Sequence, residues 1–176
     1  MLSGIGPRAT LEKYSIPMLS KLAGVGQSLW DQLLFSKTHP DHSAHSTEIE
    51  YATGTSITPN GNDLALIEAA LSAPVLRGNV TIASADISTP PVIDMAWLTD
   101  PADADAQVAV AAVKRMREAF ASIANITLGQ ELAPGPDIQS DAEILAYIRK
   151  TSVTIYHAAA TCAMGKRGDS NAVVDS

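Results

Sequence analysis

Two segments of the chain carry apolar residues at the spacing of an amphipathic helix. The first begins at Asp100 and Pro101, where a capping side chain precedes a proline that suits the first helical turn. Its apolar positions keep one face, at Val108, Ala112, Met116 and Phe120. The second follows a capping box, Ser140-Asp-Ala-Glu143, and its last turn is basic, where the helix dipole favours cations. We therefore expect a helix in each segment.

Shorter runs between turn residues predict strands at 48–51, 64–71 and 79–84, the last two as a hairpin around Arg77-Gly78. Earlier in the chain, glycine pairs at 4–6 and 24–26 predict turns. We expect one short helix between these turns and a second from Ser28 to Leu34. Strands and helices alternate without regular βαβ units. The pattern therefore predicts an α+β fold, with an antiparallel or mixed sheet and helices packed on one face.

The composition narrows the class of protein. The chain has 176 residues, 46% of them hydrophobic, which is enough for one domain with its own core. Its net charge of -7 and only 12 Lys and Arg residues argue against a nucleic-acid partner. No run is long enough to span a membrane, and the first residues lack the features of a signal peptide, so we expect a cytoplasmic protein if expressed as written. The single cysteine, Cys162, is expected to pack as a small apolar group.

A polar segment at 37–46 is the best candidate boundary within the chain. Its stretch Lys37-Thr-His-Pro-Asp-His42 partly resembles the His-x-His-x-Asp-His motif of metallo-β-lactamases, with lysine in the first position. Imidazole and carboxylate suit zinc, and the candidate ligands would be His39, Asp41, His42 and His45. Because no further histidine ligands follow downstream, a solvated polar loop is the preferred interpretation, and we predict no metal site.

One histidine lies in a context that suits chemistry. His157 stands between an apolar, strand-like run that begins at Val153 and a tight segment, Thr-Cys-Ala-Met-Gly165. Neutral imidazole can accept an alcohol proton near pH 7. We expect the apolar neighbours to keep the ring partly buried and neutral. From composition alone, the alternative is a hydrogen-bonded core histidine without a catalytic role.

Five ordered stretches resemble the glucose-methanol-choline (GMC) oxidoreductases, flavin enzymes that oxidise alcohols. They are Leu2 to Pro7, Ala23 to Gln32, Arg77 to Ile82, the pair Pro90 to Asp94 and Leu98 to Asp103, and His157 to Gly165. The second stretch resembles the flavin-contacting loop of the family, and the third a strand of its substrate domain. The variants Leu-Trp-Asp-Gln and Tyr-His-Ala-Ala-Ala-Thr-Cys are most similar to fungal members, including members of aromatic natural-product pathways.

The resemblance implies a division of the chain and a set of site residues. Residues 1–36 would be a remnant of the flavin domain, 37–156 the substrate-binding domain, and 157–176 the His motif with a truncated return to the flavin domain. His157 would be catalytic, and the substrate would be bound by Trp30, Tyr156 and His157. If a flavin domain is present, FAD would be contacted by Gly24, Val25, Gly26, Ser28, Leu29, Trp30 and Asp31.

The chain also departs from the family pattern. It has no Gly-x-Gly-x-x-Gly turn opening a βαβ unit, which in the family receives the FAD pyrophosphate. The resemblance thus implies FAD as the cofactor, and the alternative is that this chain by itself holds none. The segment at 35–47 is shorter than in the family, and the second catalytic His or Asn of the family would lie beyond Ser176. Ala160 stands where glycine is common, and Gln32 where many relatives have histidine.

Three functions remain open from the sequence. The first is the substrate-binding, His157-bearing portion of an FAD-dependent GMC-type alcohol oxidoreductase, inactive in redox chemistry until a flavin-domain partner joins it. The second is a stand-alone, cofactor-free protein of fungal natural-product biosynthesis that binds or cyclises an aromatic or polyketide ligand through His157. The third is an interaction protein, because apolar surface left by an absent flavin domain would favour a homo-oligomer or another partner.

Overall fold

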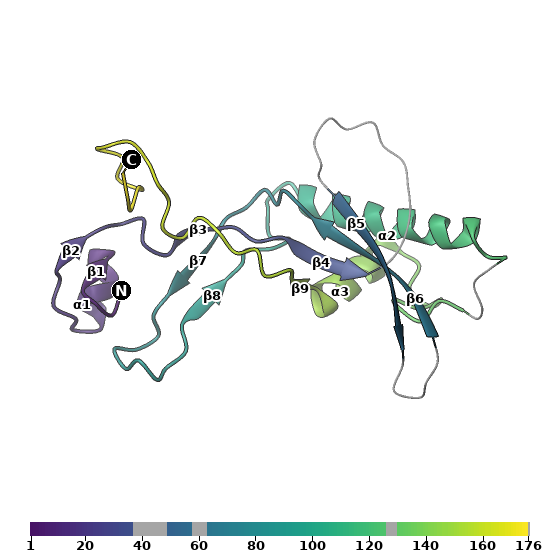
Figure 1. Ribbon diagram of the computed structural model, residues 1–176, viewed down its shortest axis with the longest axis horizontal. Coiled ribbons are helices and arrows are strands. Elements are labelled where there is room, and N and C mark those ends of the chain that lie inside the picture. The colour runs from purple at the N-terminus through teal and green to yellow at the C-terminus, as the bar shows by residue number, and fades with distance from the viewer. Residues whose placement is uncertain (37–48, 58–62, 126–129, 176) are drawn as a thin grey trace. The chain divides into compact units, whose positions relative to one another are not determined.

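The computed structural model describes residues 1–36, 49–57, 63–125 and 130–175 (Figure 1). The helices are α1 (Arg8–Lys13), α2 (Ala104–Ser122) and α3 (Asp141–Thr151). The strands are β1 (Ile5–Gly6), β2 (Ser20–Lys21), β3 (Gln27–Leu29), β4 (Leu33–Ser36), β5 (Ile49–Ile57), β6 (Asp63–Leu71), β7 (Gly78–Thr81), β8 (Val92–Asp94) and β9 (Val153–Thr154).

The chain forms two compact units. Unit 1 consists of residues 1–31, 76–97 and 157–176, and unit 2 of residues 32–75 and 98–156. The division at 36/37 and 156/157 that the resemblance implies stays a prediction. No helix in the described part of the chain is long and apolar enough to cross a membrane.

Unit 2 is built on an antiparallel sheet with the strand order β5-β6-β4-β9. Leu33 and Phe35 of β4 lie opposite Leu71 and Ala69 of β6. Residues directly opposite each other in a sheet share a face, and these four side chains are all buried. One face of the sheet therefore forms one side of a hydrophobic core.

The two long helices of unit 2 close that core. Helix α2 contacts β6 and packs against α3 (Figure 1). Its most buried side chains recur at helical spacing, at Ala109, Ala112, Val113 and Met116. Helix α3 adds Ile144 and Ile148, which are fully buried. The predicted α+β class, with antiparallel sheets and helices, is confirmed.

The start of α2 differs slightly from the prediction. The helix begins at Ala104 rather than at Pro101, and Asp103 before it has a left-handed φ of 51°. The predicted capping residue still acts, because the Asp100 carboxylate accepts the N–H of Ala104 at 2.7 Å and that of Asp105 at 3.3 Å. Asp100 therefore caps the helix from outside its first turn.

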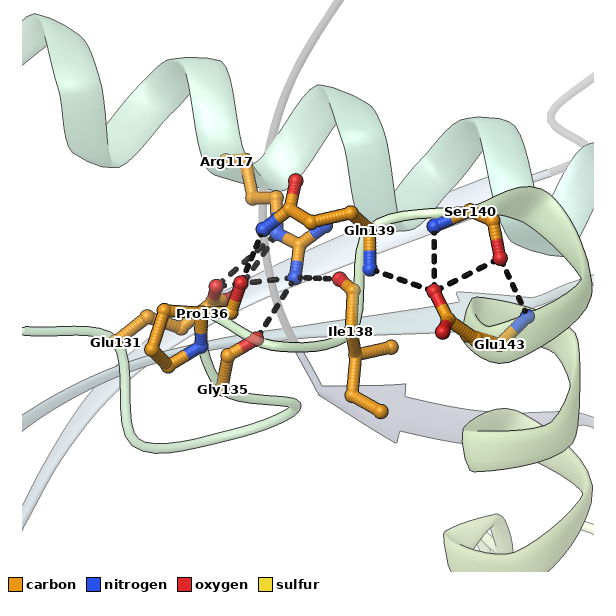
Figure 2. Close-up of polar contacts among 8 residues, drawn as sticks. All are labelled: Arg117, Glu131, Gly135, Pro136, Ile138, Gln139, Ser140 and Glu143. Carbon is orange, nitrogen blue, oxygen red and sulfur yellow. Dashed lines mark hydrogen bonds and ion pairs between the residues drawn. The ribbon is translucent and has the colours of Figure 1, made fainter.

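The capping box of α3 is confirmed (Figure 2). Ser140 Oγ accepts the N–H of Glu143 at 3.3 Å, and Glu143 Oε2 accepts the N–H of Ser140 at 2.9 Å. A further bond comes from the N–H of Gln139. Since these bonds favour the charged carboxylate, those from Ser140 most, they hold the pKa of Glu143 below its ordinary value.

Unit 1 contains little core of its own. Its sheets are the parallel pair β1-β2 and the antiparallel set β3-β7-β8. Among the described residues of this unit, the buried apolar side chains are Leu11 and Leu29. Its large exposed apolar side chains are Met18, Leu19, Ile87, Val92, Ile93, Met164 and Val174. Unit 1 therefore leaves much apolar surface in contact with water.

Two predictions about local structure are wrong. The residues from Ser28 to Leu34 form parts of β3 and β4 and not a helix, because each strand finds partners far away in the sequence. The predicted hairpin around Arg77-Gly78 does not form, since β6 pairs with β5 and β4 whereas β7 pairs with β3 and β8. The predicted strands themselves are confirmed as β5, β6 and β7.

Arg117 on α2 anchors the loop that leads to α3 (Figure 2). Its Nε donates to both carboxylate oxygens of Glu131, at 3.2 and 3.1 Å. Its Nη2 donates to the carbonyls of Gly135 and Ile138, at 3.2 and 2.7 Å. The two charged side chains are only 21% and 17% exposed. The planar guanidinium thus satisfies three separate acceptors at once.

We predict that Arg117→Ala lowers the free energy of unfolding by about 2–3 kcal/mol, because the change leaves the Glu131 carboxylate and two carbonyls unpaired. Arg117→Lys should recover only part of this loss, since an ammonium lacks the fork. Urea unfolding followed by circular dichroism measures both. The control is Lys114→Ala, which removes a pair with Asp141 that is largely exposed and should cost less than about 1 kcal/mol. Equal losses in Arg117→Ala and Lys114→Ala would contradict the anchoring role.

Candidate functional site

In unit 1 the His motif runs antiparallel to the loop that the resemblance assigns to the flavin. The N–H of Trp30 donates to the carbonyl of Ala159 at 3.1 Å, and the N–H of Ala159 donates back to the carbonyl of Trp30 at 2.8 Å. Further along, the N–H of Gly26 donates to the carbonyl of Thr161 at 2.8 Å. Two motifs that lie far apart in the sequence are therefore paired directly.

Asp31 fixes the start of the His motif. Its side chain is buried, and Oδ1 accepts the backbone N–H of His157 at 3.1 Å. Its backbone carbonyl accepts the indole N–H of Trp97 at 3.1 Å. Asp31 thus connects all three chain segments of unit 1. This role of Asp31 and Trp97 was not predicted, because the only signal in the sequence was the need of an indole N–H for an acceptor.

Left-handed backbone brackets His157 on both sides. Tyr156 has a φ of 64° and Ala160 a φ of 71°. A residue with a Cβ atom adopts this region at a cost of about 1–2 kcal/mol. The conformation at Ala160 gives a physical reason why glycine is common there in the resembling family. Backbone strain of this kind clusters at functional sites, so it supports a functional role for this turn.

The expected burial of His157 is wrong. His157 is exposed, and so are the residues on both sides of it, from Tyr156 to Ala160. Tyr156 alone is 86% exposed, so the apolar neighbours form no cover over the imidazole within this chain. Cys162 is also exposed rather than packed. The left-handed turns explain the difference, because they interrupt the regular strand that would have placed alternate side chains in a core.

The predicted substrate-binding residues differ in their surroundings. Tyr156 and His157 are exposed, whereas Trp30 is half-buried. The guanidinium of Arg77 lies 5.6 Å from the centre of the Trp30 ring, within range of a cation–π interaction. The indole Nε1 of Trp30 is buried and has no hydrogen-bond acceptor among the described residues. Trp30 and His157 belong to paired segments of unit 1, and their role in substrate binding stays a prediction.

The glycines of the predicted flavin loop pack against the chain's own backbone. A Cβ atom on Gly24 would lie 1.9 Å from the carbonyl oxygen of Asn171. A Cβ atom on Gly26 would lie 2.1 Å from the carbonyl oxygen of Val80, and Gly26 has a φ of 81°. Close packing within unit 1 is therefore sufficient reason for glycine at both positions.

The fit of FAD to this loop can be judged from its backbone donors. A pyrophosphate needs several free N–H groups that converge on it. Here the N–H groups of Val25, Gly26, Gln27 and Trp30 already donate to carbonyls of unit 1. Leu29 and Asp31 are buried, so the half-buried Val25 and Trp30 and the exposed Ser28 remain for contact with a ligand. Residues 24–31 therefore do not form a cradle for the phosphates of FAD.

The described part of the chain contains no candidate metal site. Among residues 1–36, 49–57, 63–125 and 130–175, no group of three or more His, Cys, Asp or Glu side chains could hold a metal ion. The alternative ligand set lies outside the described residues, at His39, Asp41, His42 and His45.

Comparison with known proteins identifies the family. The family model described as GMC oxidoreductase matches residues 74–176, which is more than half of the chain. The chain belongs to the GMC oxidoreductase family. The resemblance noted in the sequence is thereby confirmed.

The following relatives of the chain are fungal proteins. The chain is 36% identical to the dehydrogenase pkfF of Emericella nidulans, over 99% of this chain and 39% of the relative. It is 33% identical to versicolorin B synthase of Aspergillus parasiticus, over 100% of this chain and 37% of the relative. An FAD-dependent oxidoreductase of Chaetomium thermophilum shares the fold, with a TM-score of 0.70 at 21% identity, over 99% of this chain and 45% of that one.

The chain spans about two fifths of the length of the curated relatives it matches. The two alignments extend over 243 and 240 positions, whereas the chain has 176 residues. The relatives therefore carry several dozen residues inside the aligned region that have no counterpart here. The shortening expected at 35–47 falls mostly outside the described residues.

We predict that Ala160→Gly raises the free energy of unfolding by up to about 1 kcal/mol, because glycine adopts a φ near 71° without a clash of its Cβ atom. The gain is smaller than the full strain, since glycine also increases the entropy of the unfolded chain. The matched control is Ala158→Gly, outside the left-handed region, which should lose stability. Urea unfolding measures both variants. A loss of the same size in both would show that the turn is not strained.

Proposed function

We propose that this chain supplies the proton-accepting histidine of a GMC-type alcohol oxidoreductase, and that the chain alone has no redox activity. The observation that supports this proposal best is the placement of His157. The residue is exposed, lies between two left-handed residues, and is tied to a buried carboxylate in a chain of this family. Strain and tight anchoring around an exposed imidazole suit a residue that must meet a substrate.

Alcohol oxidation removes a proton from oxygen and a hydride from carbon. In the proposed reaction the His157 imidazole takes the O–H proton, which is the role of a general base. The hydride needs a redox cofactor, because no side chain accepts one. Because residues 24–31 form no cradle for FAD phosphates, these phosphates would have to be held by other residues. The loop at 24–31 would then offer only side contacts, through Val25, Ser28 and Trp30.

A partner is part of this proposal. Unit 1 has a thin core and a set of exposed apolar side chains, given above. Burying such surface is favourable by about 25 cal/mol per Å². The proposed partner is a flavin-bearing portion of a GMC protein, either from another chain or from residues that flank this sequence. Self-association is the alternative way of covering the same surface.

A second function has one specific observation in its favour. The relative from Aspergillus parasiticus is named a synthase rather than a dehydrogenase. The alignment with it covers 100% of the present chain. Residues 24–31 also lack a phosphate cradle, which a cofactor-free protein would not need. In this alternative, the chain binds or cyclises an aromatic or polyketide ligand, and His157 moves the proton.

The test combines the full chain, in the presence of added FAD, with the portion of the dehydrogenase pkfF that this chain does not match and measures alcohol-dependent reduction of a dye. We expect activity only in the mixture. His157→Gln should lower the rate by about 10²–10⁴-fold, the usual contribution of a general base. The control is Lys166→Gln, an exposed residue of the same unit, which should leave the rate unchanged.

Three outcomes separate the candidates. Alcohol oxidation by the mixture that depends on His157 supports the first function. Conversion of a phenolic ligand by the chain alone, without FAD and lost in His157→Gln, supports the second. Full activity in His157→Gln, in either assay, removes the catalytic role from His157.

A further inference from the structure

We propose that Asp31 is a positioning residue for His157, and that its carboxylate acts on the His157 backbone instead of on a flavin. The inference rests on the proposed function only in so far as His157 is catalytic. The resemblance to the family had placed Asp31 among the cofactor contacts. Its geometry within unit 1 assigns it a different task.

The carboxylate of Asp31 is well placed to hold a backbone. Asp31 is 3% exposed, and Oδ1 lies 3.1 Å from the backbone nitrogen of His157. A hydrogen bond with a charged acceptor is stronger than one between neutral groups. The indole of Trp97 donates to the Asp31 carbonyl at 3.1 Å, and this contact fixes the main chain from which the carboxylate extends. Asp31 is thus itself held in place before it acts on His157.

His157 needs such a contact because its neighbours are strained. The left-handed residues Tyr156 and Ala160 stand on either side of it, and this conformation costs each of them about 1–2 kcal/mol relative to ordinary backbone. The main-chain pair between Trp30 and Ala159 restrains the C-terminal side of this turn. The bond from Asp31 restrains the N-terminal side, at the residue that carries the imidazole. Losing the hydrogen bond between Asp31 and the His157 N–H would keep the imidazole but would let the backbone of His157 change direction.

Mispositioning a general base lowers the rate of the chemical step much more than it weakens substrate binding. With added FAD and the unmatched portion of the dehydrogenase pkfF present, Asp31→Asn should therefore lower kcat and change KM little. A cofactor contact would behave differently, since its loss would weaken the binding of FAD to the mixture. These two readouts distinguish positioning from cofactor contact.

The direct test uses nuclear magnetic resonance on the full chain alone and needs no activity. The variants are Asp31→Ala, which removes the acceptor, and Asp31→Asn, which keeps the shape with a weaker, neutral acceptor. The matched control is Asp105→Ala in unit 2. Asp105 is also 3% exposed, and its carboxylate accepts the N–H of Val75 at 3.1 and 3.0 Å. His157→Gln identifies the ring signals of His157.

We expect the His157 amide to exchange with solvent about tenfold to a hundredfold faster in Asp31→Ala than in the unchanged chain. In Asp31→Asn the acceleration should be smaller, several-fold. The ring signals of His157 should shift in both variants, and neither the amide nor the ring should respond to Asp105→Ala. Unchanged exchange in Asp31→Asn, or an equal response to Asp105→Ala, would overturn the inference. Asp31→Asn decides the matter by itself if Asp31→Ala fails to fold.

The outcome is separable from that of the proposed function. Faster exchange at His157 in the Asp31 variants supports the positioning role even if His157→Gln retains full activity, in which case only the catalytic function falls. Activity that depends on His157, together with unchanged exchange in the Asp31 variants, overturns the positioning role and leaves the catalytic function intact.

Discussion

The hydrogen bond from the His157 backbone to the buried carboxylate of Asp31 is the contact on which the site depends. The two residues are 126 positions apart in the sequence, and the bond brings the His motif onto the loop at 24–31. A buried carboxylate is costly unless its lone pairs are used, so the contact is also a requirement of Asp31 itself. The same bond therefore satisfies a buried charge and fixes an exposed, strained turn that carries an imidazole.

The two units are stabilised by different interactions. Unit 2 encloses a core between one face of its sheet and two helices, and Arg117 anchors the loop that joins these helices. Unit 1 is assembled from three separate chain segments and relies on backbone pairing and close glycine contacts more than on apolar burial. A region of this kind gains stability when another surface covers it, which agrees with the proposal that the chain works with a flavin-bearing partner.

Local rules explain what the sequence could predict. The capping box at Ser140 and the helical spacing in α2 are short-range signals, and both helices form. The predicted helix at 28–34 fails because strand pairing with distant segments outweighs local preference. The exposure of His157 was missed because left-handed backbone at Tyr156 is invisible in a hydrophobic pattern. The one indication of left-handed backbone in the sequence was Ala160, which stands at a position where glycine is common in the family. Resemblance located the loop at 24–31, but it could not show that four of its N–H groups, those of Val25, Gly26, Gln27 and Trp30, already have acceptors.

The measurement that tests this account most directly is a titration of FAD with the purified full chain, followed by flavin fluorescence and absorbance. Because the N–H groups of Val25, Gly26, Gln27 and Trp30 are used within unit 1, we expect a colourless protein that does not change the flavin signal. Saturable binding of one flavin per chain would contradict this expectation, since that result would require a phosphate site which residues 24–31 do not form.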